Sequence, residues 1–128
     1  MALIVVDASV LIAHLDPADA LHGAATRALL EHAADDLRLP ASAYAETLVE
    51  PARANRLEEA RAAIAQLALI LVPIDGTLAE RAAALRASER SLRLPDALVL
   101  ACGDLLDADS ILTGDRRWRR YPRVRVVR

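Results

Sequence analysis

The sequence predicts an α/β fold in which a mainly parallel central sheet of four to five strands is flanked by α-helices. Short runs rich in valine, isoleucine and leucine alternate along the chain with longer segments whose apolar residues recur at helical spacing. This alternation is typical of parallel strands joined by helical crossovers. The length of 128 residues suits one domain, residues 1–128, and no repeat, linker or low-complexity segment divides the chain.

Five short apolar segments are the expected strands. The first is continuously apolar from Ala2 to Val6, as in a strand that is buried on both faces, and Asp7 ends it. The second is short and is closed by Pro40. The expected strands comprise residues 2–6, 37–39, 69–74, 110–113 and 124–127.

Six segments between and around these strands are expected to be helical. Ser42 is the expected N-cap of the third helix, and Pro51 is expected to kink or divide that helix. Pro95 suits the first turn of the last helix. The expected helices comprise residues 9–15, 22–34, 42–55, 57–67, 76–90 and 95–106.

The basic residues exclude several classes of chemistry. All 16 of them are arginine, and seven of these lie between Arg116 and Arg128. Without lysine the chain has no Schiff base, no P-loop lysine and no receiver-type or dehalogenase-type lysine. A GC-rich genome would also favour arginine and alanine over lysine, so the composition has a second explanation.

Metal ligation by sulfur or nitrogen is not indicated. Cys102 is the only cysteine and lies in an apolar run, which favours a small buried side chain and a reducing compartment. His14, His22 and His32 lack the spacing of a zinc site. The apolar N-terminus stops at Asp7 and lacks the basic region of a signal peptide, and no stretch is long enough to span a membrane. We therefore expect a soluble cytoplasmic protein.

Four carboxylates are placed where they can meet at one edge of the predicted sheet. Asp7 directly follows the first strand, and Asp115 follows the fourth after a single glycine. Ligands of open parallel sheets bind beyond the carboxyl ends of the strands. Asp96 lies in the first turn of a helix and Glu46 one turn into another. Each has a structural alternative, since an acid in a first turn offsets the helix dipole, an aspartate after a strand makes turns, and Glu46 can be solvated.

The surroundings of Asp7 favour a partner for its charge. Apolar sequence lies on both sides of it, and burying a carboxylate costs several kcal/mol without compensation. The compensation must come from arginine, backbone N–H groups, a proton or a metal ion. Several acids without nearby cations suit Mg²⁺ or Mn²⁺, which prefer carboxylate oxygens.

At this point the sequence resembles a known family, the PIN-domain ribonucleases, and especially the VapC-type toxins of bacterial toxin–antitoxin pairs. The resemblance spans nearly the whole chain, and its four pieces occur in order and at suitable separations. These pieces are IVVDASVLI with Asp7 and Ser9, YAETLVE with Glu46, LPDALVLACGDLL with Asp96, and ILTGDRRW with Thr113 and Asp115.

The resemblance implies a parallel sheet and an acidic pocket that binds one or two Mg²⁺ or Mn²⁺ ions and cleaves RNA. It implies that Asp7, Glu46, Asp96 and Asp115 are the catalytic and metal-binding acids, called here the acidic quartet. Ser9 and Thr113 become hydroxyls that orient the ligands or a water. The chain departs from the family where many relatives carry another acid two residues after the last aspartate, because Arg117 stands there. Without this additional acid the chain has one fewer ligand for a second metal ion, whereas all four acids of the quartet are present.

The arginine-rich segment after Asp115 has two interpretations. The net charge is −2, so the chain without an ionised quartet would carry +2, which predicts a mildly basic surround for an acidic pocket. Arginines bind phosphate in a bidentate manner, and an aromatic ring can stack on an unpaired base. Equally, the arginines can pair with surface acids or an antitoxin, and the tryptophan can belong to the core. The candidate RNA-binding residues are Arg116, Arg117, Trp118, Arg119 and Arg120.

We therefore expect a metal-dependent endoribonuclease that is the toxin of a type II toxin–antitoxin system. Its expected partners are RNA, a small cognate antitoxin and a second copy of the chain, with the Ala/Leu-rich helices between residues 41 and 70 supplying the contacts. One alternative is a PIN-like nuclease of RNA processing outside any toxin–antitoxin pair. Another, motivated by Arg117, is a non-catalytic RNA- or protein-binding module with a degenerate pocket.

Overall fold

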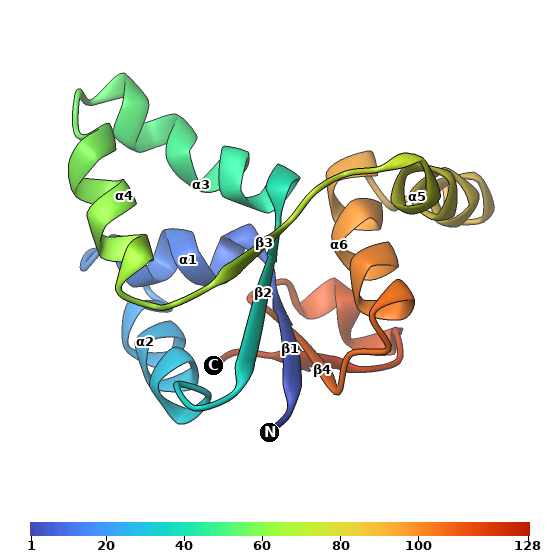
Figure 1. The fold of residues 1–128 in the computed structure, drawn as a ribbon, viewed down its shortest axis with the longest axis horizontal. Coiled ribbons are helices and arrows are strands. Elements are labelled where there is room, and N and C mark those ends of the chain that lie inside the picture. Colours follow the sequence, from blue (N-terminus) through green and yellow to red (C-terminus); the bar gives the residue numbers. More distant parts are fainter.

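A computed structural model describes all residues of the chain, Met1–Arg128. Five parallel strands form one sheet in the order β3-β2-β1-β4-β5 (Figure 1). The predicted fold class is therefore confirmed, with every strand parallel. The strands are β1 Leu3–Val6, β2 Asp36–Pro40, β3 Ile70–Val72, β4 Ser110–Thr113 and β5 Val124–Val126.

Six α-helices and one short 3₁₀ helix connect the strands. In Figure 1 the pair α1 and α2 lies on one side of the sheet and the pair α5 and α6 on the other, while α3 runs from the end of β2 toward α4 on the side of α1 and α2. No helix is long and apolar enough to cross a membrane. The helices are α1 Ala8–Leu15, α2 His22–Glu31, α3 Ala41–Arg53, α4 Leu57–Ala65, α5 Gly76–Ser88, α6 Leu94–Leu105 and the 3₁₀ helix η1 Arg116–Arg120.

The two central strands, β1 and β4, form the middle of the core. Val5 and Val6 of β1 are fully buried, and all four residues of β4 are buried. Helix α6 packs closely on β4 at Gly103, where an added Cβ would lie 2.3 Å from Ile111 Cδ1. The sheet is thus held rigidly between helices, and the carboxyl ends of β1 and β4 are fixed relative to each other.

The expected N-cap of α3 is wrong, and the helix is not divided at Pro51. The helix begins at Ala41 directly after β2, so the N-cap position is Pro40 and Ser42 lies inside the first turn. The Ser42 hydroxyl is buried and has no hydrogen-bond partner. Pro51 does not divide the helix, because it lies in the last turn and removes only one N–H donor. The helix ends instead before Asn55, whose φ of 56° is left-handed.

Candidate active site

The quartet comes together because of the strand order. Strands β2, β1 and β4 are neighbours, and the Asp7 N–H extends the pairing of β1 with β4 by donating to Leu112 O at 2.9 Å. Asp7 and Asp115 therefore lie at the carboxyl ends of adjacent strands. Helix α3 follows β2 and carries Glu46, and the first turn of α6 carries Asp96. Both acids are near enough to Asp7 for charge repulsion to raise their pKa values.

Asp7 is the buried centre of the site. The residue lies between the end of β1 and the start of α1 and is only 8% exposed. Its Oδ2 accepts hydrogen bonds from Ser9 Oγ at 2.6 Å and from Thr113 Oγ1 at 2.9 Å. No arginine lies within ion-pair distance of it. A carboxylate is thus held in the interior by two hydroxyls, without a counter-charge.

The two hydroxyls are fixed in turn by the backbone beyond β4. Ser9 Oγ accepts from the Gly114 N–H at 2.9 Å, and Thr113 Oγ1 accepts from the Asp115 N–H at 3.1 Å. Each hydroxyl therefore directs its own proton to Asp7. A side chain at Gly114 would collide with Leu21, since its Cβ would lie 2.9 Å from Leu21 Cδ1. This packing sets the direction in which Asp7 presents its carboxylate.

Three members of the quartet resist ionisation. Burial raises the pKa of Asp7, and hydrogen bonds from Ser9 and Thr113 only partly offset the effect. Burial, followed by repulsion from Asp7 and Asp96, raises the pKa of Glu46. Burial raises the pKa of Asp96, and repulsion from Asp7 and Asp115 adds to it although Arg93 acts in the opposite direction. None of the three acids is hydrogen-bonded to a positively charged side chain that would cancel these effects.

Asp115 differs from the other three because an arginine neutralises it. Arg117 Nε lies 3.0 Å from Oδ1 and Nη2 lies 2.8 Å from Oδ2, and the Arg117 N–H also donates to Oδ1 at 2.9 Å. Hydrogen bonding to Arg117 holds the pKa of Asp115 below its ordinary value. The side chain of Asp115 caps η1 in the process. The residue at the position where relatives carry an acid thus pairs with the last acid of the quartet.

The donor set fits a hard divalent cation. The quartet offers carboxylate oxygens only, and three of the four lack a hydrogen-bonded cation, which suits Mg²⁺ or Mn²⁺ better than zinc. The buried Ser42 hydroxyl, which has no hydrogen-bond partner, lies one helical turn before Glu46 on the same face of α3. No three His, Cys, Asp or Glu side chains are already close enough to form a coordination sphere. An ion would therefore have to draw the acids together.

The five candidate RNA-binding residues, Arg116 to Arg120, differ in whether their side chains are exposed and unpaired. Trp118 is 3% exposed and belongs to the hydrophobic core, so it is not available to stack on a base. Arg120 pairs with Glu89 and lies over the Tyr121 ring. Arg116 and Arg119 are exposed and form no ion pair. Of the five candidate RNA-binding residues, these two retain free guanidinium groups.

Arg93 is a site residue that the sequence did not single out. Its Nε lies 3.8 Å from Asp96 Oδ2, too long for a hydrogen bond, and its charge lowers the pKa values of Glu46, Asp96 and Asp115. The sequence places Arg93 three residues before Asp96, and this spacing could have indicated that Arg93 lies beside Asp96 at the N-terminus of α6. Helix neighbours at this spacing lie on one face.

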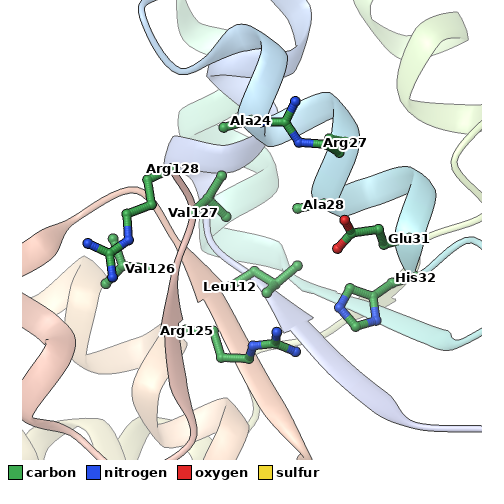
Figure 2. Close-up of a pocket in the computed structure, with 10 residues that line it drawn as sticks. All are labelled: Ala24, Arg27, Ala28, Glu31, His32, Leu112, Arg125, Val126, Val127 and Arg128. Atoms are coloured by element: carbon green, nitrogen blue, oxygen red, sulfur yellow. The ribbon is translucent and has the colours of Figure 1, made fainter.

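A separate hollow lies away from the quartet. Figure 2 shows it between α2 and the C-terminal strand, with a volume of about 170 Å³. Arg27, Glu31 and His32 border it on the helix side, and Arg125 and Arg128 on the other. None of the quartet lines it, so it does not mark the candidate active site.

Comparison with known proteins assigns the family. The sequence matches the family model of the PIN domain over residues 4–124. The chain belongs to the PIN-domain family. The resemblance stated from the four sequence pieces is thereby confirmed, whereas the roles of individual residues in this PIN domain stay predictions.

Solved structures with the same fold include toxins and toxin–antitoxin complexes. A chain of a toxin–antitoxin complex from Klebsiella pneumoniae is 25% identical, with a TM-score of 0.78 over 98% of this chain and 97% of that one. The sarcin–ricin loop cleaving toxin VapC20 of Mycobacterium tuberculosis is 20% identical, with a TM-score of 0.82 over 98% and 99%. A chain of VapBC2 from Rickettsia felis, bound to promoter DNA, is 10% identical, with a TM-score of 0.78 over 98% and 99%. No curated protein matches the sequence.

The hydroxyl network predicts the effect of Ser9→Ala. The substitution removes a hydrogen bond that lowers the pKa of Asp7, so that pKa should rise further. Because Asp7 must lose its proton to bind a cation, the pH of half-maximal Mn²⁺ binding should shift upward. The affinity at neutral pH should fall about 10- to 100-fold. Calorimetric titration between pH 5 and about pH 8 measures both effects.

Ser88→Ala is the matched control for this prediction. Ser88 is exposed at the end of α5, where its hydroxyl donates only to Leu85 O. It should leave the pH of half-maximal binding where it is. An unchanged pH dependence in Ser9→Ala would show that Ser9 does not orient Asp7.

Proposed function

We propose that this PIN domain is a metal-dependent endoribonuclease and the toxin of a type II toxin–antitoxin pair. The observation that carries the proposal is the buried Asp7 carboxylate, held by two hydroxyls beside Glu46 and Asp96 without a hydrogen-bonded cation. Such an arrangement costs free energy in the absence of a cation and recovers it when one binds. The proposed metal-binding and catalytic residues are Asp7, Glu46, Asp96 and Asp115, which hold one or two Mg²⁺ or Mn²⁺ ions.

The residues of the chain have separate roles in this proposal. When bound, a divalent ion lowers the pKa of water and neutralises charge on a phosphodiester. Ser9 and Thr113 fix the direction of the Asp7 carboxylate. Glu46 and Asp96 supply further oxygens from two helices, so cation binding also joins α3 to α6. The exposed Arg116 and Arg119, next to Asp115 in sequence, attract the phosphates of RNA toward the acids.

The partners follow from the similar proteins. The Klebsiella chain comes from a toxin–antitoxin complex, the Rickettsia chain comes from VapBC2 bound to a DNA fragment from its promoter, and VapC20 is named as a sarcin–ricin loop cleaving toxin. We propose an RNA substrate and a small antitoxin for this chain as well. We also propose a homodimer, because Val49 on α3 and Ile70 and Leu71 on the edge strand β3 are large apolar side chains that the single chain leaves exposed.

One alternative has a specific observation in its favour. Arg117 occupies both oxygens of Asp115, so only three acids of the quartet are unneutralised. A non-catalytic module that binds RNA or protein would tolerate this arrangement.

A nuclease of RNA processing outside any toxin–antitoxin pair would share the active site and differ only in lacking an antitoxin. A short neighbouring gene for a DNA-binding protein separates that reading from the proposed toxin.

Cleavage of a mixed cellular RNA pool tests the proposal. The purified protein, freed of any antitoxin, should produce discrete fragments with Mg²⁺ or Mn²⁺ and none with EDTA. Asp96→Asn should lower the cleavage rate more than about 100-fold. Loss of a residue that only hydrogen-bonds to a metal ligand costs about 10- to 100-fold, and loss of a ligand itself should cost more. Asp75→Asn is the control, because Asp75 caps α5 away from the quartet and asparagine caps equally well. If the folded, antitoxin-free wild type cleaves no RNA with either metal ion, the binding module becomes the better interpretation.

A further inference from the structure

The contact between Arg117 and Asp115 is the best-formed ion pair of the site. Two guanidinium nitrogens and one backbone nitrogen donate to the two carboxylate oxygens, at 2.8 to 3.0 Å. This bidentate geometry is the strongest that arginine makes with a carboxylate. The η1 helix fixes both residues in one short turn, so the pair forms locally and does not depend on distant parts of the chain.

The other three acids have no comparable partner. Asp7 is bonded by hydroxyls, and Glu46 has no ion pair. Asp96 has Arg93 at 3.8 Å, outside hydrogen-bond distance. Asp115 is therefore the only acid of the quartet that is hydrogen-bonded to a positively charged side chain. Asp7, Glu46 and Asp96 have no such bond.

The guanidinium of Arg117 also has donors left over. An arginine has five N–H donors, and the bonds to Asp115 use one on Nε and one on Nη2. The Nη1 group makes no hydrogen bond, and the Arg117 side chain is 84% exposed. Its free edge can contact a phosphate while the opposite edge stays bonded to Asp115.

We propose that Arg117 is a built-in cation of the site: it holds Asp115, leaves Asp7, Glu46 and Asp96 to bind a single divalent ion, and presents its free N–H groups to the phosphate that is cleaved. This inference rests on the proposed nuclease function and narrows it to one ion. Asp115 then acts as a positioning residue for Arg117. Oδ1 of Asp115 already accepts two hydrogen bonds and Oδ2 accepts one, so a second ion would have to bind at Oδ2 beside the guanidinium charge or displace the guanidinium. The arginine therefore takes over the charge neutralisation that a second ion would provide.

Calorimetric titration of the full chain with Mn²⁺ tests the inference without a cleavage assay. The wild type should bind one ion. Arg117→Ala frees both oxygens of Asp115, so Mn²⁺ should bind about 10-fold more tightly, the factor that corresponds to loss of one competing charge-assisted bond. Arg116→Ala is the matched control, because it removes an equal charge from the neighbouring residue without touching Asp115. Its Mn²⁺ affinity should change less than about 3-fold, as for a screened surface charge.

Cleavage kinetics at saturating Mn²⁺ supply the second half of the test. Arg117→Ala should lower kcat about 100-fold although the ion binds more tightly, since a donor to the developing charge is lost. Two bound ions in the wild type, or equal effects of Arg116→Ala and Arg117→Ala on Mn²⁺ affinity, would overturn the inference. If Asp96→Asn binds Mn²⁺ as the wild type does, the proposed metal pocket itself fails, and that result is distinct from failure of the role of Arg117 alone.

Discussion

Replacing Asp7 by asparagine is expected to abolish RNA cleavage and, in the metal-free protein, to raise the melting temperature. Asparagine keeps one oxygen to accept the hydroxyl protons of Ser9 and Thr113, so the fold is preserved. The charge at the buried centre of the quartet is lost. Cleavage should fall about 1,000-fold or more, equivalent to roughly 4 kcal/mol of transition-state stabilisation.

The stability gain follows from the direction of the pKa shift. Burial raises the pKa of Asp7 above its ordinary value of 3.8, so the folded state favours the protonated form more than the unfolded state does. Ionising Asp7 therefore destabilises the fold as pH rises through this window, and the loss is complete above the raised pKa. Asp7→Asn should therefore be more stable than the metal-free wild type at neutral pH, and each 1 kcal/mol gained would raise Tm by roughly 3 to 5 °C. Near pH 3, where both states are protonated, the difference should be close to zero.

Added Mn²⁺ should reverse the order of the two proteins. An ion that binds only the folded wild type stabilises it by about 2.7 kcal/mol at 100 times the dissociation constant, whereas the variant gains little. Thermal unfolding at several pH values, with and without Mn²⁺, measures all of these effects. Asp75→Asn, outside the quartet, should follow the wild type throughout. A lower Tm for metal-free Asp7→Asn at neutral pH would contradict an uncompensated charge at Asp7.

The fold was predictable because it depends on local sequence patterns. The continuous apolar run of β1 indicates a strand that is buried on both faces, and the amphipathic segments between the strands indicate helical crossovers. The rule that ligands bind beyond the carboxyl ends of parallel strands singled out Asp7 and Asp115, although the strand order itself was not predicted. The α3 N-terminus was misassigned because β2 leads into the helix at Pro40 without a loop.

The chemistry within the site was less predictable, because it depends on which side chains meet after folding. Position alone showed that Arg117 replaces an acid, but not that it would neutralise Asp115 through both oxygens. Arg93 was overlooked for the same reason. Three arginine residues that look alike in RRWRR have different environments, since Arg117 pairs with Asp115, Arg120 pairs with Glu89, and Arg119 is free. The sequence gives the total charge of this segment, but only the tertiary structure shows which acid each arginine pairs with.

Trp118 gives the second large effect, on stability. Its ring is buried in the core between arginines that are exposed, because the 3₁₀ turn of η1 directs this one side chain inward. Truncation to alanine should cost about 3 to 5 kcal/mol, from lost apolar burial and the cavity left behind. That is a large part of the 5 to 15 kcal/mol by which domains of about this size are stable. Trp118→Ala should therefore unfold at a much lower urea concentration, and Trp118→Phe should be intermediate.

The same experiment decides between the two roles considered for this residue. Arg119→Ala, one position along and exposed, should change the unfolding free energy by less than about 0.5 kcal/mol. Trp118 is the only tryptophan, so its fluorescence reports directly on its surroundings. A buried ring should emit at short wavelength in the folded protein, shift to longer wavelength on unfolding, and be insensitive to single-stranded RNA. Normal stability of Trp118→Ala together with weaker RNA binding would instead show a base-stacking residue, and would place η1 differently from the arrangement described above.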